Sequence, residues 1–237
     1  MFDLIYANGD SFTAGTDTKA SNQCLFTYNG YKQNLKNVKQ SKNKQQQLLD
    51  KNGSYVQHLE SITGIHSINA AIPGSGNTSI VLDTLKDLEI YKQKYHNILC
   101  LVNITDCNRL WYPNLKNTAN IATHKPVSKT EAEFSKTVVL NSDRKTWSMI
   151  SIIQYFGLIN YCKLNNIVLY FIGGPLFNMD TIEENILWQD IYDMTVDFIG
   201  GQHIHLMKNE AIWTQTGHLP EKFHIELADR LAGLLKI

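Results

Sequence analysis

The sequence predicts an α/β protein built on a mostly parallel β-sheet with helices on both faces. Short apolar runs typical of buried strands alternate along the chain with stretches of helical periodicity; the runs cover residues 2–8, 66–71, 97–102 and 167–172. The connections between them are long enough for crossover helices, which join parallel strands. With 237 residues, 43% of them hydrophobic, the chain can form one large domain with a substantial core.

The first predicted helix follows the first long polar stretch. Residues 54–62 carry apolar side chains at helical spacing, Ser54 can cap the N-terminus, and Gly64 would end the helix. The last helix begins at Pro220, a residue suited to a first helical turn, and ends near Leu235.

The remaining elements lie between these two helices. Helices are expected at residues 79–91, 147–164 and 182–198, and a short strand at 203–206. The helix at 147–164 is expected to bury an apolar stripe, which consists of Ile150, Ile153, Phe156, Gly157 and Tyr161.

Two polar stretches interrupt the regular pattern. We expect a single domain over residues 1–237, with a polar insertion at about 16–53 and an irregular excursion at about 107–145. The insertion is rich in Lys, Asn and Gln, which favours an exposed loop with a short helix; a lid over a substrate is the alternative.

Composition excludes several classes of partner. Lys and Arg balance Asp and Glu at 22 each, so nothing indicates binding to nucleic acid or to an acidic lipid surface. No apolar run is long enough to cross a bilayer, and the N-terminus does not have the pattern of a signal peptide, so a cytoplasmic protein is expected. The Asn-, Lys- and Ile-rich composition suggests an AT-rich bacterial or viral genome; a viral protein would lie in the host cytoplasm or the virion.

The four cysteines form no CxxC pair, which favours buried, reduced thiols and no zinc site.

Polar or glycine residues follow each predicted strand. They include Ser11, Gly74, Asn103 with Thr105, and Gly173. In a parallel sheet the carboxyl ends of the strands share one edge, where ligands bind. A serine at that edge can be a nucleophile, although Gly9-Asp10-Ser11 also has the composition of an ordinary turn.

This series of positions resembles the SGNH/GDSL hydrolase superfamily over the whole chain. Gly9-Asp10-Ser11 is similar to its first block, and residues 69–74 to its second. Residues 103–106 lie where the family carries Gly-x-Asn-Asp, and residues 216–219 where it often carries Asp-x-His-Leu. The resemblance implies a three-layer α/β/α sandwich with a flavodoxin-like sheet.

The resemblance also implies a set of site residues. Ser11 would be the nucleophile and His218 its general base. The oxyanion would be held by the backbone amides of Ser11 and Gly74, with a further donor from Thr105 or Asn103. Asp10 and Thr216 would support these groups.

The sequence departs from the family at two positions. Thr105 replaces an asparagine, and its hydroxyl has a shorter reach. Thr216, or Gln215 on the other spacing, replaces the aspartate that would orient His218. Glu210, Glu221 or a backbone carbonyl could take that role.

The resemblance implies an esterase that acts on a small acyl or O-acetyl ester, which could be carried by a carbohydrate. It requires no cofactor and no metal, and its partner is the ester substrate. The alternative is a binding or structural protein that keeps the scaffold without the activity.

Other residues have two interpretations each. Arg109 could contact an anionic substrate group or form a surface salt bridge. His203 and His205 could form a metal pair but are better explained as ordinary strand histidines. His224 is expected to be structural, and residues 73–77 lack the sequence features of a phosphate-binding loop.

Overall fold

The central element is a five-stranded sheet in which every pair of neighbouring strands is parallel. The computed structural model describes residues 2–15, 53–73, 75–105, 109–110, 119–120, 133, 144–173, 191, 193–197 and 219–236. The strand order is β2 (Ser67–Asn69), β1 (Leu4–Asn8), β3 (Ile98–Ile104), β6 (Val168–Gly173) and β7 (Thr195–Asp197). The predicted parallel sheet is confirmed.

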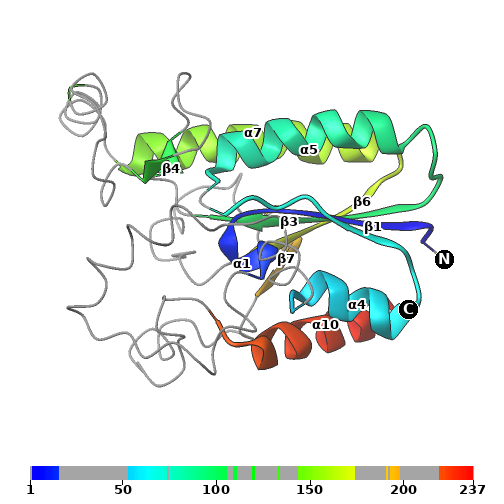
Figure 1. Cartoon of the computed structure of the whole chain (residues 1–237). Helices are drawn as coiled ribbons and strands as arrows, with labels where there is room; N and C mark the ends of the chain where they lie inside the picture. The colour runs from blue at the N-terminus through cyan, green and yellow to red at the C-terminus, as the bar shows by residue number, and fades with distance from the viewer. Residues whose placement is uncertain are drawn as a thin grey trace, which may run out of the picture.

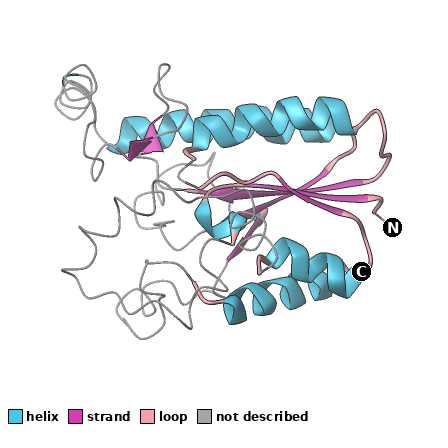
Figure 2. Cartoon of the chain, in the orientation of Figure 1, coloured by secondary structure: helices cyan, strands magenta, loops and turns pink. Residues whose placement is uncertain are grey.

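Helices cover both faces of the sheet (Figure 1). One face carries α5 (Asn77–Tyr91) and α7 (Arg144–Leu164), and the other carries α4 (Tyr55–Thr63) and α10 (Glu221–Leu235). Figure 2 shows the three layers edge-on. The α/β/α sandwich expected from the resemblance is confirmed.

Two apolar cores lie between these layers. Tyr6 and Cys100 face the core beneath α5 and α7, whereas Ile5 and Leu99 face the core beneath α4 and α10. Because β1 and β3 are buried on both faces, all of their residues are shielded from solvent. This explains why the sequence of β3 is almost continuously apolar.

The predicted caps of α4 agree with the structure, whereas α5 and α7 begin two and three residues before their predicted starts at 79 and 147. Ser54 caps α4, and its hydroxyl accepts a hydrogen bond of 3.4 Å from the backbone N–H of Gln57. Gly64 ends this helix in the left-handed conformation, with φ of 69°. Pro220 is the N-cap of α10, one residue before the first helical residue.

Two sequence predictions are wrong. The predicted stripe of α7 contains exposed residues, with Ile153 63% and Ile150 37% accessible, and the buried apolar side chains are Ile152, Tyr155, Leu158, Ile159 and Cys162. Residues 195–197, expected in a helix, form the edge strand β7. The pairing of β7 with β6 outweighs local periodicity there.

Two short elements were not predicted. A helical turn, α1 (Ser11–Ala14), follows β1, and an antiparallel pair, β4 (Arg109–Leu110) with β5 (Ala119–Asn120), lies within the predicted excursion. The insertion at 16–52 and the strand at 203–206 lie outside the described residues.

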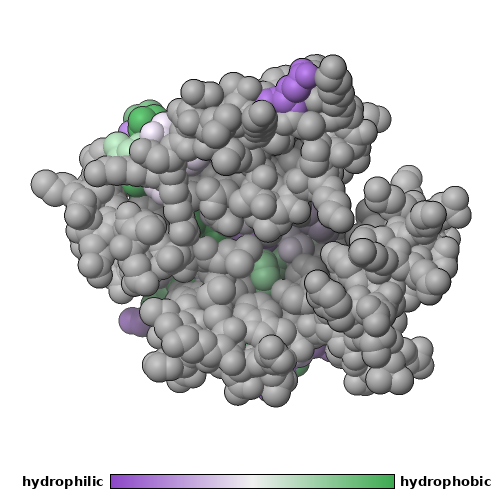
Figure 3. All heavy atoms as spheres, turned by 90° about the vertical axis from the view of Figure 1, so that its left-hand side faces the viewer, coloured by the Kyte–Doolittle hydropathy of each residue, from purple (hydrophilic) through white to green (hydrophobic). Residues whose placement is uncertain are grey.

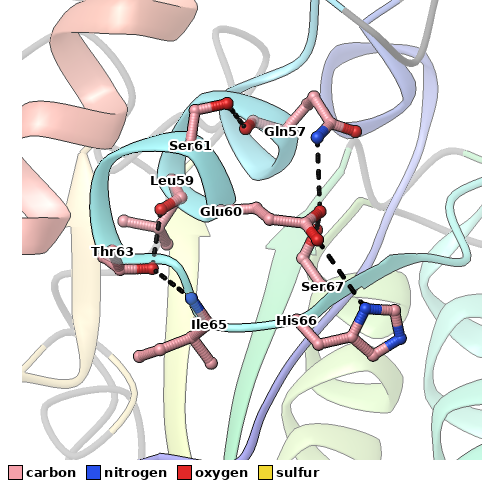
Figure 4. Close-up of polar contacts among 8 residues, drawn as sticks. All are labelled: Gln57, Leu59, Glu60, Ser61, Thr63, Ile65, His66 and Ser67. Carbon is pink, nitrogen blue, oxygen red and sulfur yellow. Dashed lines mark hydrogen bonds and ion pairs between the residues drawn. The ribbon is translucent and has the colours of Figure 1, made fainter.

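Polar contacts attach the end of α4 to the edge strand β2 (Figure 4). The Glu60 carboxylate accepts hydrogen bonds from the Ser67 hydroxyl at 2.6 Å and from the Gln57 side chain at 3.3 Å. Its other oxygen lies 3.7 Å from Nδ1 of His66. These contacts lie around the turn between α4 and β2 and help to hold β2 beside β1.

None of the helices among the described residues has the length and hydrophobicity that a bilayer-crossing segment requires.

Candidate functional site

The candidate site lies where the strand order of the sheet reverses. The chain passes from β1 outward to β2 on one side and returns to β3 on the other. At such a switch point the loops after two adjacent strands diverge, and ligands bind between them. Since Asn8 of β1 is paired with Val102 of β3, the residues that follow the two strands lie close together.

This edge of the sheet is on the left in Figure 1, and Figure 3 views the molecule from that side. The described residues visible there form small hydrophilic and hydrophobic patches.

The Gly9-Asp10-Ser11 segment forms a tight turn into α1. Asp10 is the N-cap of α1, and its Oδ1 accepts a hydrogen bond of 3.0 Å from the backbone N–H of Phe12. Ser11 is the first helical residue and is 7% accessible. No hydrogen bond joins its hydroxyl to another described residue. Ser11 therefore directly follows the turn after β1, at the carboxyl edge of the sheet.

Gly9 is essential to the shape of this turn. A Cβ atom at Gly9 would lie 2.4 Å from Oγ1 of Thr13 and 2.6 Å from Cβ of Asn103. Both distances are too short for nonbonded atoms, so α1 can fold back against the end of β3 only because residue 9 lacks a side chain. The preceding Asn8 fixes the entry to the turn, since its Oδ1 accepts a hydrogen bond of 2.8 Å from the Gly9 N–H.

A buried hydrogen bond joins the two strand ends. The Thr105 hydroxyl donates to Oδ2 of Asp10 at 2.8 Å, and both side chains are at most 4% accessible. The sequence suggested Thr105 as an oxyanion donor, but a hydroxyl has one proton, and here Asp10 accepts it. Asn103 is also engaged: it is fully buried within β3, and its side-chain amide donates to the Ile172 carbonyl at 3.0 Å.

Asn69, at the end of β2, connects the second block to the turn. Its side-chain amide donates to the Thr13 carbonyl at 2.8 Å and to the Ser54 hydroxyl at 3.2 Å. Its oxygen accepts a hydrogen bond of 3.2 Å from the Ala71 N–H. One asparagine therefore joins α1, the start of α4 and the loop that leads to Gly74.

Other site predictions fall on residues beyond the described ranges. Gly74, Thr216 and His218 lie outside them, as do Glu210, Gln215, His203 and His205. Arg109 is described only as backbone, in β4. Glu221, one of the possible acids, starts α10, and its Oε1 lies 3.3 Å from Nε2 of His58.

His224 has a structural environment, as the sequence suggested. It is 1% accessible, its ring stacks on Tyr55 at a centroid distance of 6.3 Å, and its Nδ1 accepts a hydrogen bond of 3.2 Å from the Tyr55 backbone N–H. Burial raises the pKa of the Tyr55 phenol, which therefore stays protonated. The pair holds α4 against α10.

Sequence reasoning missed Asn77, the first residue of α5. It is 3% accessible, and its side chain contacts Thr105, Ser151 and Tyr155. An asparagine that follows a glycine loop was a possible signal, but its partners on α7 are more than 70 residues away in sequence. Within the described part of the chain, no three potential metal ligands come together.

No family model and no curated protein matches this sequence. Solved structures do share its fold. A protein described as lipolytic and of the G-D-S-L family, from Desulfitobacterium hafniense, has a TM-score of 0.51 at 12% identity; the match covers 98% of this chain and 99% of that one.

Two carbohydrate esterases of family two are similar as well. An active-site mutant from Clostridium thermocellum has a TM-score of 0.55 at 14% identity, and the match covers 98% of this chain and 63% of that one. An enzyme with a carbohydrate-binding domain, from Corynascus thermopiles, has a TM-score of 0.51 at 10% identity, with 98% and 65% covered. The chain therefore has the fold of the SGNH hydrolases, the superfamily that its sequence motifs resemble.

Proposed function

We propose that the protein is a serine hydrolase that cleaves a small acyl or O-acetyl ester through an acyl-enzyme on Ser11. The observation that carries this proposal is the placement of Ser11 as the first residue of α1, at the switch point of an SGNH-type sheet. A nucleophile there is presented at the edge where ligands bind in sheets of this kind.

The reaction proceeds by acyl transfer. His218 accepts the proton of the Ser11 hydroxyl as Ser11 attacks the ester carbonyl, and the alcohol leaves with a proton returned by His218. Water then hydrolyses the acyl-enzyme by the same route. The chemistry needs neither a metal nor an organic cofactor.

The backbone N–H groups of Ser11 and Gly74 stabilise the oxyanion. The Thr105 hydroxyl is held by Asp10, so its role in this proposal shifts to fixing the turn that carries Ser11. One N–H of the Asn103 side-chain amide is likewise bound, to the Ile172 carbonyl. Asp10 supports the site as the cap of α1.

A carbohydrate O-acetyl ester is the proposed natural substrate class. Its support is the likeness in fold to two carbohydrate esterases, alongside the lipolytic protein. Acetate release from an acetylated oligosaccharide, compared with release from long-chain fatty esters, tests this choice directly. Preference for the fatty ester would contradict it.

A non-catalytic binding protein is the second candidate, and Thr216 favours it. Loss of the carboxylate that orients a catalytic histidine can lower the rate by about four orders of magnitude. Such a protein would bind the carbohydrate or ester without cleaving it.

The deciding experiment compares the hydrolysis of p-nitrophenyl acetate by the wild type, Ser11→Ala and His218→Ala. Both variants should fall to the background rate, whereas Ser61→Ala, a change at an exposed serine of α4, should leave the rate unchanged. Labelling of Ser11 by an organic fluorophosphonate, read by peptide mass spectrometry, checks the nucleophile itself. Equal rates for the wild type and Ser11→Ala would reject the esterase and leave the binding protein.

A further inference from the structure

The side-chain amide of Asn77 is fully hydrogen-bonded in the buried space between α5, α7 and the end of β3. Its Oδ1 accepts from the Thr105 N–H at 3.0 Å and from the Tyr155 hydroxyl at 2.5 Å. Its Nδ2 donates to the Thr105 carbonyl at 3.1 Å and to the Ser151 hydroxyl at 3.1 Å. These four bonds use both acceptor and both donor positions of the amide.

Two of these bonds pair Asn77 with the backbone of Thr105 alone. A strand receives the same pair of bonds, one to its N–H and one to its carbonyl, from a residue on a neighbouring strand. The Asn77 side chain therefore takes the place that a residue of a neighbouring strand would have beside Thr105. It holds the backbone in place just beyond Ile104, the last residue of β3. The pairing also fixes the orientation of the amide, since a flipped amide would set N–H against N–H.

The bonds continue from Thr105 to the turn that carries Ser11. The Thr105 hydroxyl donates to Asp10 at 2.8 Å, and Asp10 accepts the Phe12 N–H at 3.0 Å. A continuous series of hydrogen bonds therefore leads from α7 through Asn77, Thr105 and Asp10 to the first turn of α1.

Asn77 also stands directly after the glycine loop. Gly76 is the N-cap of α5, and residues 73–76 contain Gly74, the proposed second oxyanion donor. Asn77 thus connects this loop, which it follows in the chain, to the Ser11 turn through its hydrogen bonds with Thr105. A shift of about 1 Å between a nucleophile and the groups that stabilise its transition state can cost about 100-fold in rate.

We propose that Asn77 is a positioning residue of the esterase site: its amide fixes the Ser11 turn relative to the glycine loop, with Ser151 and Tyr155 holding the amide. This inference rests on the proposed function for its catalytic consequence. Its structural part, the coupling of Asn77 to the Ser11 turn, can be measured without any activity.

A neighbouring residue provides a matched control. Thr78 and Gln154 also join α5 to α7 by side-chain hydrogen bonds, with distances of 3.2 and 3.0 Å, but among the described residues neither side chain bonds to Thr105 or Asp10. Thr78→Val therefore weakens the same helix pair without breaking the series that leads to Ser11.

Backbone amide exchange followed by NMR tests the coupling. In Asn77→Ala, we expect exchange protection at Thr105 and Phe12 to fall more than about tenfold, because the Thr105 N–H loses its acceptor and the Asp10 cap loosens. Thr78→Val should change both by less than about twofold. Should Asn77→Ala fail to fold, Tyr155→Phe and Ser151→Ala each remove one bond to the amide and should give smaller changes of the same kind.

Kinetics test the consequence for the reaction. In Asn77→Ala, kcat should fall about 10- to 100-fold while KM stays within about threefold, because the turn is misplaced while the substrate pocket remains. Thr78→Val should keep both constants. Unchanged protection at Phe12 in folded Asn77→Ala, or equal losses of kcat in both variants, would overturn the inference. If the wild type showed no hydrolysis that depends on Ser11, the proposed function would be rejected, and with it the catalytic role of Asn77. The exchange data would still show whether Asn77 is coupled to the Ser11 turn.

Discussion

The Thr105 hydroxyl donates a hydrogen bond of 2.8 Å to the Asp10 carboxylate and so ties the end of β3 to the turn after β1. Both groups are buried, and each follows a central strand of the sheet. The contact lies where the strand order reverses, next to the proposed nucleophile.

Replacing Thr105 separates the two roles considered for its hydroxyl. Thr105→Val removes a donor to a buried carboxylate and should lower the free energy of unfolding by about 1–3 kcal/mol, measured by urea denaturation. Thr105→Ser keeps a hydroxyl and should lose less. A Thr105→Val protein that lost 100-fold or more in kcat without losing stability would instead support the oxyanion role.

Gly9 should not tolerate a side chain. Gly9→Ala places a methyl group 2.4 Å from Oγ1 of Thr13 and 2.6 Å from Cβ of Asn103, and the overlap should cost about 1–3 kcal/mol of unfolding free energy. The control is Gly157→Ala in α7, where a Cβ meets no atom within 4 Å. This change should stabilise the protein by about 0.5–1 kcal/mol, since alanine favours a helix. Equal effects at the two sites would refute this account of the turn.

Asp3 should contribute stability that acid removes. The backbone N–H groups of Asn97 and His96 donate to its carboxylate at 3.0 and 3.1 Å and lower its pKa below the ordinary value of 3.8. A lowered pKa in the folded state stabilises the protein above the unfolded value, and this stabilisation disappears as the pH falls through the folded value.

Asp3→Asn should therefore be less stable than the wild type at pH 6. The difference should shrink below about pH 4 in urea titrations over a range of pH. Asp229→Asn, at an exposed position of α10, controls for the loss of a charge. A difference that stayed constant down to pH 2 would argue against these hydrogen bonds.

His224 should matter for stability and not for the reaction. His224→Ala removes a buried ring and the acceptor of the Tyr55 N–H, and it should cost about 2–4 kcal/mol. The control is His66→Ala, at an exposed residue whose Nδ1 lies 3.7 Å from the Glu60 carboxylate. It should lower the free energy of unfolding by less than about 1 kcal/mol. Folded His224→Ala should keep the kcat of the wild type; a loss as large as that of His218→Ala would make His224 part of the mechanism.

The sequence predicted the sheet and its edge because a strand that is buried on both faces is apolar at nearly every position. The apolar run of β3 and the Gly-Asp-Ser turn after β1 are both local patterns. The caps of α4 could be predicted for the same reason, since Ser54 and Gly64 bond to backbone groups within the first and last turns of the helix.

The wrong predictions concern features that depend on contacts between residues far apart in the sequence. Ile150 and Ile153 have the spacing of a buried stripe, but α7 packs against α5 through a different face, which includes Ile152 and Tyr155. No local pattern distinguishes these two faces of an apolar helix. The end of the third strand also differs: the sequence predicted it at residue 102, whereas β3 extends to Ile104 and includes the buried Asn103.

The contact between Tyr55 and His224 has a consequence for the order in which the protein can fold. It joins segments separated by 169 positions, and α10 packs together with α4 on one face of the sheet. A ribosome makes α10 only after all five strands of the sheet and every other helix described here. Until then the side chains of Ile5, Leu99 and Leu101 lack the cover that α10 provides, so the nascent chain presents an apolar surface to chaperones until α10 has left the ribosome.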